Sequence, residues 1–443
     1  MRKLSLLALL LSAFTAQADL LTALQAHENK DFAKASTEFT QLLPLGNELA
    51  AFNLGAMAYN GEGQAVDKVK ALAYFEFAAA RNHNDSKALV EKLKTTLSAD
   101  EQHKADALLE QLQQQVKVDR AVQQDLRPES EKNRKGLKRV APVFPKEAAE
   151  HGAFGSVTLR MLVNEAGDVE AVDVLNAFPK GVFEKSAINA LKKWKYEPGN
   201  AKFIGKVVIQ FNIGEIDARK MRRLFDDNKL WQYSAMGSPV HQNAIANVLH
   251  VARSHSAYTQ FVDKSLPPVL GEVTSDFVAQ PKPLNADLTL PQGYDLDAFV
   301  TVDAQGKVTA VHDSNVKRKA KLTASLVGHQ LTTDKIDAGF YRLDMNYFKK
   351  GPRLLPAQRI PETLTDYFWL EQAARGGNIE AQRALAAYRP DWEKYLLEQQ
   401  DPVVQSWAGT RLILDGKKAE GEKLLDAAIA KGHVAAKELK AAL

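Results

Sequence analysis

The residues that could do chemistry in this chain are few, and their spacing does not assemble them into a site. His241, His250 and His255 are of the type that binds zinc, but they do not repeat on one helix face and no acidic or cysteine ligand completes a set. We therefore expect packed or solvated roles for all three. A nucleophile elbow, a phosphate-binding loop, a zinc-binding helix and a spaced carboxylate pair are all missing from the sequence. The sequence predicts no catalytic residue, no metal and no cofactor, and hence no enzyme; a hydrolase built on a His–Asp pair is the alternative.

Composition narrows the class of protein further. The chain has 443 residues, of which 45% are hydrophobic and 25% charged, so it is globular and too long for a single core. The formal net charge of +4 is too small to indicate nucleic-acid binding. The absence of cysteine excludes disulfides, thiolate zinc sites and iron–sulfur clusters.

The first residues have the pattern of a secretory signal. Arg2 and Lys3 precede an apolar run from Leu4 to Phe14, which is well short of the roughly 20 residues that span a bilayer. Ala16-Gln17-Ala18 is a small-x-small cleavage motif. We expect a cleavable signal peptide over residues 1–18, a periplasmic location and no integral membrane span after cleavage. An uncleaved anchor is the alternative.

The elements that must position any binding surface are clearest in the middle of the chain. Residues 155–163 and 169–174 alternate like two strands, and Gly167 between them is placed for a turn with positive φ. Apolar residues at helical spacing follow over 183–194, and residues 206–213 alternate again. The order is strand, strand, helix, strand.

This segment resembles the C-terminal domain family of TonB, the energy-transducing protein of the Gram-negative envelope. The resemblance covers residues 139–216 and includes a Trp-Lys-Tyr-Glu-Pro stretch at 194–198. We expect Trp194 and Tyr196 to be core anchors between helix and sheet. The motif residues are Pro142, Phe144, Pro145, Gly155, Gly167, Phe183, Trp194, Tyr196 and Pro198.

The resemblance implies binding of protein partners by strand addition. In this family an extended segment of an outer-membrane receptor adds to a sheet edge and is held by backbone hydrogen bonds. Receptor segments or other envelope proteins are the implied partners. An edge capped by the protein's own flanking segments is the alternative. The candidate edge is Val207, Val208, Ile209, Gln210, Phe211, Asn212 and Ile213.

Other features depart from a working energy transducer. The apolar run is short, carries no polar relay residue such as His, and ends in a cleavage motif. Helical repeats stand in place of the family's Pro-rich spacer, and Ala141 and Val143 stand where the family often has Gln. A periplasmic binding module is therefore the favoured function, and a membrane-anchored TonB-type energy transducer for outer-membrane transport is the alternative.

Helical periodicity dominates both ends of the mature chain. Residues 54–79 resemble a Sel-like repeat, a relative of the tetratricopeptide repeat, and residues 368–385 and 424–436 resemble its second helix. Such repeats bind proteins or peptides, which implies a further interaction surface. Bracing of the neighbouring domain is the alternative. The repeat motif is Leu54, Gly55, Tyr59, Gly61, Gly63, Ala71, Ala78 and Ala79.

A weaker internal repeat of the central pattern, called the internal echo below, begins near residue 299. Residues 299–308 align with the first hairpin, with Gly306 in the place of Gly167, and a helix over 322–331 and a strand over 340–347 are expected after it. We interpret this as a degenerate second copy; an unrelated hairpin with a common turn is the alternative.

The predicted fold class is multidomain α+β, a TonB C-terminal-like β-β-α-β domain with its degenerate second copy, flanked by helical Sel-like or TPR-like repeats. The expected divisions are a signal peptide (1–18), helical repeats (19–118), a charged linker (119–138), the TonB-like domain (139–216), a helical segment with a Pro-rich connector (217–282), the second copy (283–350) and C-terminal helical repeats (363–443).

Overall fold

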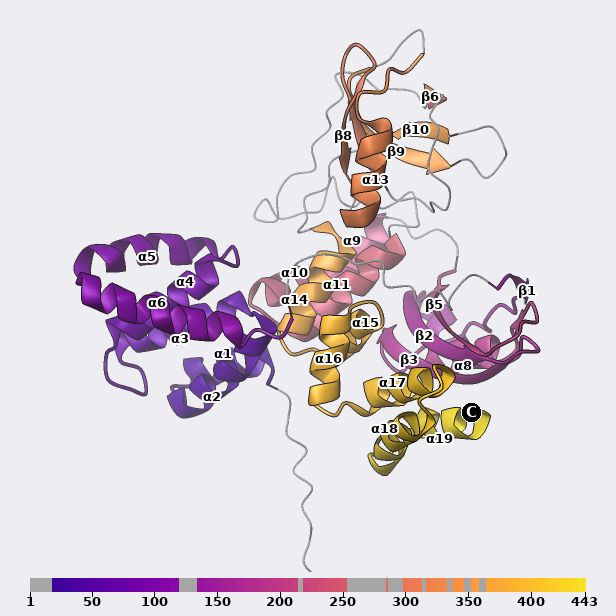
Figure 1. Cartoon of the computed structure of the whole chain (residues 1–443), viewed down its shortest axis with the longest axis horizontal. Coiled ribbons are helices and arrows are strands. Elements are labelled where there is room, and N and C mark those ends of the chain that lie inside the picture. Colours follow the sequence, from indigo (N-terminus) through magenta and orange to yellow (C-terminus); the bar gives the residue numbers. More distant parts are fainter. Residues whose placement is uncertain are drawn as a thin grey trace, which may run out of the picture. The chain divides into compact units, whose positions relative to one another are not determined.

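The computed structural model describes residues 18–118, 134–213, 218–252, 284–285, 298–312, 316–332, 337–345, 352–357 and 364–443. The expected signal peptide up to residue 17, most of the charged linker and His255 lie outside these ranges. The fold is mixed α+β, with helices at both ends of the described chain and small sheets between them (Figure 1). The chain divides into two compact units. The first comprises Met1–Leu43 and Asn47–Gln114, and the second comprises Pro44–Gly46 and Gln115–Leu443.

The first unit is helical, and side-chain caps begin its helices. Asp19, Asp31, Asn47 and Asp67 each accept a hydrogen bond from a backbone N–H of the first turn, which would otherwise lack a partner within the helix. The helices are α1 (Leu20–Glu28), α2 (Phe32–Leu42), α3 (Glu48–Asn60), α4 (Lys68–Ala79), α5 (Asn84–Thr96) and α6 (Ala99–Gln114).

Glycines allow α3 and α4 to approach and turn. A Cβ on Gly55 would lie 2.8 Å from the Phe75 ring, so the small residue is required for the packing of these helices. Gly61 and Gly63 have φ of 76° and 69° in the connecting turn, where other residues would be strained. Leu54, Ala71 and Ala78 are buried, while Tyr59 and Ala79 are half-buried.

The second unit contains a three-stranded antiparallel sheet in the order β3-β2-β5. Strand β2 (Gly155–Val163) pairs along its length with β3 (Val169–Phe178) on one side and β5 (Phe203–Phe211) on the other. Helix α8 (Glu184–Leu191) connects β3 to the last strands. Short elements accompany this sheet. Strand β1 (Gly136–Lys138) pairs with β4 (Lys195–Tyr196), and α7 (Lys146–Glu150) precedes β2.

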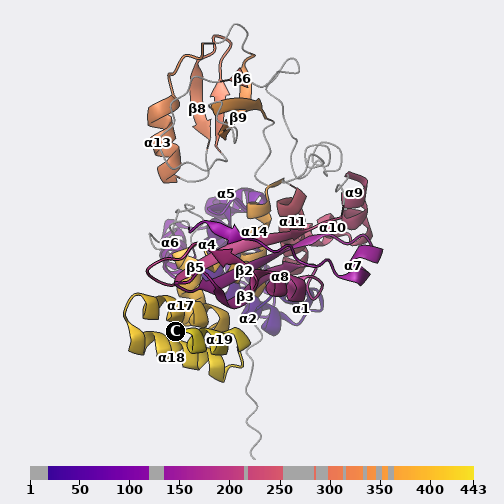
Figure 2. The same ribbon diagram turned by 90° about the vertical axis from the view of Figure 1, so that its right-hand side faces the viewer.

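The two faces of this sheet enter different cores. Val157, Leu159 and Met161 of β2 pack with Ala187 and Leu191 of α8. On the opposite face, residues of β2 and β3 pack against the C-terminal helices, which lie beside the sheet in Figures 1 and 2. That second core comprises Leu162, Ala171, Leu175, Val403, Trp407, Leu425, Ala428, Ala436 and Leu439.

Helices from two distant parts of the sequence complete the unit. Helix α11 packs against α14, and their shared core takes in Phe154, Phe225 and Trp369. None of the described helices combines the length and hydropathy needed to cross a membrane. The helices are α9 (Ala218–Asp227), α10 (Leu230–Ala235), α11 (Pro239–Ala252), α14 (Asp366–Arg375), α15 (Ile379–Ala386), α16 (Pro390–Glu398), α17 (Pro402–Leu414), α18 (Lys418–Ala430) and α19 (Val434–Ala442).

A second sheet occupies the region of the internal echo. Its strand order is β6-β10-β9-β7-β8, and its core is shared with α13 (Figure 2). The elements are β6 (Leu284–Asn285), β7 (Phe299–Val302), β8 (Val308–His312), α13 (Val316–Leu326), β9 (Gly339–Met345) and β10 (Pro352–Pro356).

Several expected elements differ in their bounds: β3 runs to Phe178 rather than to 174, and α8 ends at Leu191 rather than at 194. The last strand of the central sheet runs over 203–211 rather than 206–213, because β2 begins at Gly155, which pairs with Phe211 and leaves no strand residue opposite Asn212 or Ile213. The helix expected over 322–331 runs over 316–326, because Gly328 adopts a φ of 91° and the chain then turns back toward Lys307.

Candidate partner-binding edge

Strand β5 is the outer strand of the central sheet, since no described strand pairs with its other side. Of the candidate residues, Val207, Val208, Ile209, Gln210 and Phe211 lie in this strand. Asn212 and Ile213 lie beyond it, and Ile213 is 51% exposed. The structure therefore places five of the seven candidates in the edge strand and the other two just beyond its end.

The turn before β3 depends on glycine. Gly167 has a φ of 89°, as expected from its position, and a Cβ there would lie 2.0 Å from the carbonyl oxygen of Tyr196. The Tyr196 N–H donates to the Gly167 carbonyl at 2.8 Å, so the turn and β4 are held together. Gly155 is equally constrained, since a Cβ would lie 1.9 Å from the Phe178 carbonyl oxygen.

Aromatic residues fix β5 against α8 and the segment before α7. Phe183 stacks on Phe211 with ring centroids 4.4 Å apart, and Phe144 packs edge-on against both rings. Pro145 follows and caps α7 with a φ of −62°, close to the angle that its ring imposes. Pro142 and Pro198 are not in this core: Pro142 is half-buried and Pro198 exposed.

Trp194 and Tyr196 both contribute to the core between helix and sheet, as expected. Trp194 is half-buried, and its indole Nε1 donates to the Val140 carbonyl at 2.9 Å. Tyr196 is buried beside Phe203, and burial raises the pKa of its phenol. Tyr196 thus packs directly on Phe203, at the start of the edge strand.

The second face of β5 is lined by C-terminal residues. Ile204 packs on the core formed with the C-terminal helices, and the Lys206 ammonium lies over the ring of Tyr388. Lys202 pairs with Glu170 at 2.9 Å and also donates to the carbonyl of Ala442. Tyr388 therefore covers part of this face of the edge strand.

A buried polar cluster joins the sheet to these helices, and no local sequence pattern predicts it. The Asp173 carboxylate accepts a hydrogen bond from Trp407 Nε1 at 3.0 Å and lies 2.7 Å from His433 Nε2. Asp173 alternates with apolar residues in a strand, and its partners are more than 200 positions away. Nothing local in the sequence marks these residues as neighbours.

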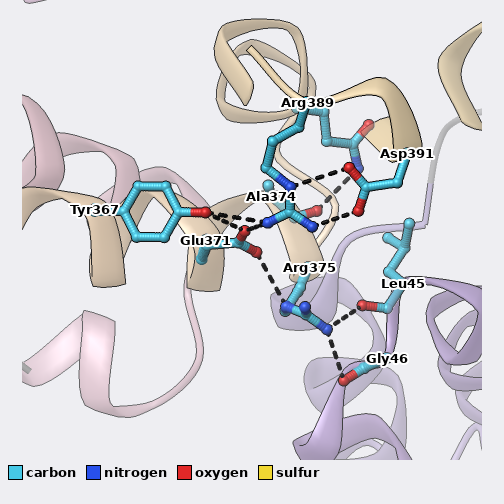
Figure 3. Close-up of polar contacts among 9 residues, drawn as sticks. Leu45, Gly46, Tyr367, Glu371, Ala374, Arg375, Arg389 and Asp391 are labelled. Carbon is cyan, nitrogen blue, oxygen red and sulfur yellow. Dashed lines mark hydrogen bonds and ion pairs between the residues drawn. The ribbon is translucent and has the colours of Figure 1, made fainter. Parts of the chain in front are cut away.

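A second polar network lies within the helical region (Figure 3). Glu371 pairs with Arg375 and Arg389, Arg389 also pairs with Asp391, and Tyr367 donates to Glu371 at 3.0 Å. Burial, together with Glu371, raises the pKa of Tyr367 above its usual range. Arg375 donates to the carbonyls of Leu45 and Gly46, a short segment of the same unit. Each carboxylate and guanidinium drawn thus has an ion-pair partner within this unit.

Of the three histidines singled out in the sequence, the two that the structure describes make separate polar contacts. His241 Nδ1 lies 2.7 Å from Ser238 Oγ, and burial lowers its pKa. His250 Nδ1 lies 2.8 Å from Asp366 Oδ2. Within the described ranges, no three His, Asp or Glu side chains are grouped as metal ligands.

Comparisons with known proteins converge on this part of the chain. Residues 140–213 match the family described as Gram-negative bacterial TonB protein C-terminal. Protein TonB of Salmonella typhimurium is 38% identical over 65 residues and that of Escherichia coli 35% identical over 65 residues. In both cases this is 15% of the present chain and 27% of the relative, so the chain spans about a quarter of the length of these relatives.

A solved structure is similar over the same part of the chain. The solution structure of the Pseudomonas aeruginosa TonB C-terminal domain is 24% identical and aligns with 20% of this chain and 93% of its own, with a TM-score of 0.18. The segment that carries β2, β3, α8 and β5, residues 140–213, is thus similar to the C-terminal domain of TonB.

Proposed function

We propose that this chain is an exported, periplasmic, non-enzymatic binding protein. Its TonB-like domain binds an extended segment of an outer-membrane receptor, or of another envelope protein, by strand addition at the β5 edge. The single observation that carries this proposal is the position of β5 at the end of the sheet in a segment similar to the C-terminal domain of TonB. An outer strand offers backbone donors and acceptors that an extended chain can pair with.

We also propose a division of the rest of the chain into domains. We propose a signal peptide over 1–18, Sel-like helical repeats over 19–118 and 363–443, a linker over 119–138, the TonB-like domain over 139–216, a connector over 217–282 and a second TonB-like copy over 283–350. The N-terminal repeats would supply a further surface for protein partners, since stacked helix pairs expose a continuous face.

Photo-cross-linking tests the proposal in cells. A photoreactive residue at Val208 on β5 is expected to cross-link to the periplasmic segment of an outer-membrane protein, identified by mass spectrometry. The matched control carries the same group at Val240, which is 62% exposed on α11. Equal capture of the same protein at both positions, or capture at Val240 alone, would contradict the proposed edge.

The alternative of a membrane-anchored energy transducer is decided separately. The N-terminal residue and membrane partition of the native protein would be measured. Soluble protein beginning near Asp19 supports the periplasmic binding module. Intact Met1 in the inner membrane would instead support the transducer.

A further inference from the structure

Three strands and one helix of the second sheet occur in the same order as in the first. Its hairpin β7–β8, helix α13 and strand β9 give the order β8-β7-β9, which corresponds to β3-β2-β5 with α8. Both hairpins carry a register irregularity at the end of the first strand, before Val163 and before Val302.

The turn hydrogen bonds coincide as well. The Gly167 N–H donates to the Asn164 carbonyl at 3.0 Å, and the Gly306 N–H donates to the Asp303 carbonyl at 3.0 Å. After each helix the chain returns to this turn, where the Gly167 carbonyl accepts from Tyr196 and the Gly306 carbonyl accepts from Leu331. A common hairpin turn alone would not reproduce the return of the chain after the helix.

The two sheets differ at one edge. In the first, no described strand follows β5. In the second, β10 pairs antiparallel with β9, and β6 pairs with β10. Counting from the shared turn, Val163 pairs with Phe203 and Val302 pairs with Gly339, so Gly339 corresponds to Phe203. The β9 residues 341–345 that pair with β10 thus correspond to 205–209 of β5.

We propose that the β9 edge is a strand-accepting surface of the same kind as the β5 edge and that the chain's own β10 occupies it. The occupant is a short extended segment, Pro352-Arg353-Leu354-Leu355-Pro356. Leu354 is fully buried and enters the core beside Tyr341 and Leu343, so one apolar side chain anchors the added strand. Prolines at both ends confine donation to the residues between them, since proline has no amide hydrogen.

This assignment goes beyond the proposed function, because it concerns a different edge and requires no partner protein. The chain then has two equivalent sheet edges, β9 and β5. Among the described residues, a strand pairs with the outer side of β9 but not with that of β5. A partner strand at β5 is then expected to lie opposite Gly205 to Ile209.

A disulfide trap tests the occupancy in the full chain. Arg342 is exposed, Leu355 is half-buried, and the two are paired across β9 and β10. Paired antiparallel residues have Cα atoms about 4.5–5.5 Å apart, within reach of a disulfide. The chain has no cysteine, so the intended bond is the only intramolecular disulfide that R342C/L355C can form, and non-reducing electrophoresis separates it from disulfides between two molecules. Near-complete oxidation is expected, and none in the control pair T309C/L355C, which starts from β8 at the opposite edge.

A peptide in trans tests whether the edge accepts a strand. In Leu354→Asp the buried anchor becomes a charge, so β10 should leave the edge. A labelled peptide of residues 350–358 is then expected to bind this variant about tenfold or more tightly than the parent chain, and to protect the amides of β9 from hydrogen exchange. The oxidised disulfide variant should not bind it.

Two results would overturn the proposal. One is failure of the cysteine pair to oxidise while β7, β8 and α13 keep their exchange protection. The other is equal binding of the peptide to the parent and to Leu354→Asp. If Leu354→Asp unfolds the sheet, the disulfide result decides alone. Neither readout involves β5, so failure here is distinct from failure of the proposed function.

Discussion

At the scale of single residues, two glycines with similar positive φ differ in what surrounds them. Gly167 and Gly181 have φ of 89° and 82°, but a Cβ would strike the Tyr196 carbonyl only at Gly167. We expect Gly181→Ala to cost about 1–2 kcal/mol of unfolding free energy from positive φ alone. Gly167→Ala should cost more, because Tyr196 must also move. Urea-dependent hydrogen exchange of peptides from 155–211 would measure both unfolding free energies. Equal losses in the two variants would contradict the predicted clash between a Cβ at position 167 and the Tyr196 carbonyl.

Asp173 is the residue whose removal should loosen the sheet from its helices. Asp173→Ala leaves the Trp407 indole N–H buried without its acceptor, so we expect a loss of about 1–3 kcal/mol in unfolding free energy. Asp426→Ala is the control, because the Asp426–Lys440 pair is largely exposed and such pairs contribute little. Denaturant unfolding of both variants makes the comparison. A loss no larger than the control's would argue against the buried contact.

His83 gives the helical unit a pH dependence of known sign. Burial lowers the pKa of His83 below 6.5, against the opposing effect of Asp85 and Glu48, and its ring stacks on Phe52. The unfolded chain therefore takes up more protons as pH falls through 6.5, and stability should decrease on acidification. An NMR titration assigned with His83→Asn should give a pKa below 6.5. A value above 6.5 would reverse the sign.

At the scale of elements, strand addition makes a prediction that other binding modes do not. Side chains of β5 alternate between the α8 face and the Tyr388 face, so Val207 and Val208 point to opposite sides. Once a partner is captured, photoreactive groups at these two positions should cross-link to residues of the partner on opposite faces of its strand. Cross-links to the same partner residues, or to residues at helical spacing, would exclude strand addition. Mass spectrometry of the cross-linked peptides reads out the pattern.

The elements that the sequence predicts well are those with strong local patterns. The hairpin at Gly167, the helix that became α8 and the glycine turn at Gly61 follow from side-chain period and backbone freedom. The predicted ends of β5 are wrong by three residues at the start and two at the end. The length of an edge strand is set by its neighbour β2 and not by its own alternation. Strand β10 has only five residues between prolines and was not predicted.

At the scale of the second unit, the packing could not be predicted from local patterns. The second face of β2 carries Ser156, Thr158 and Arg160 beside Leu162, a mixture typical of a solvated face. The structure covers it instead: Ser156 lies 3.3 Å from Asn247 of α11, and Arg160 lies over the Trp407 ring. These contacts join segments 91 and more residues apart, so only the fold reveals them.

The shared core predicts that sheet and C-terminal helices unfold together. Trp407 is fully buried, and replacing a buried Trp by Ala costs about 3–5 kcal/mol. Trp407→Ala should therefore raise hydrogen exchange in the sheet (155–211) as well as in α17 to α19. Val434→Ala, at an exposed position of α19, should change neither. Loss of protection confined to the helices would mean that the two layers are energetically independent.

The central claim is that β5 is the surface that binds a partner. The most direct measurement is hydrogen exchange of the full chain with and without a synthetic peptide of the partner segment identified by cross-linking. New protection is predicted on the amides of β5, centred on Gly205 to Ile209, with little change in α1 to α6. Protection that appears only on the helices of the first unit, with β5 unchanged, would contradict the account and assign binding to the repeats.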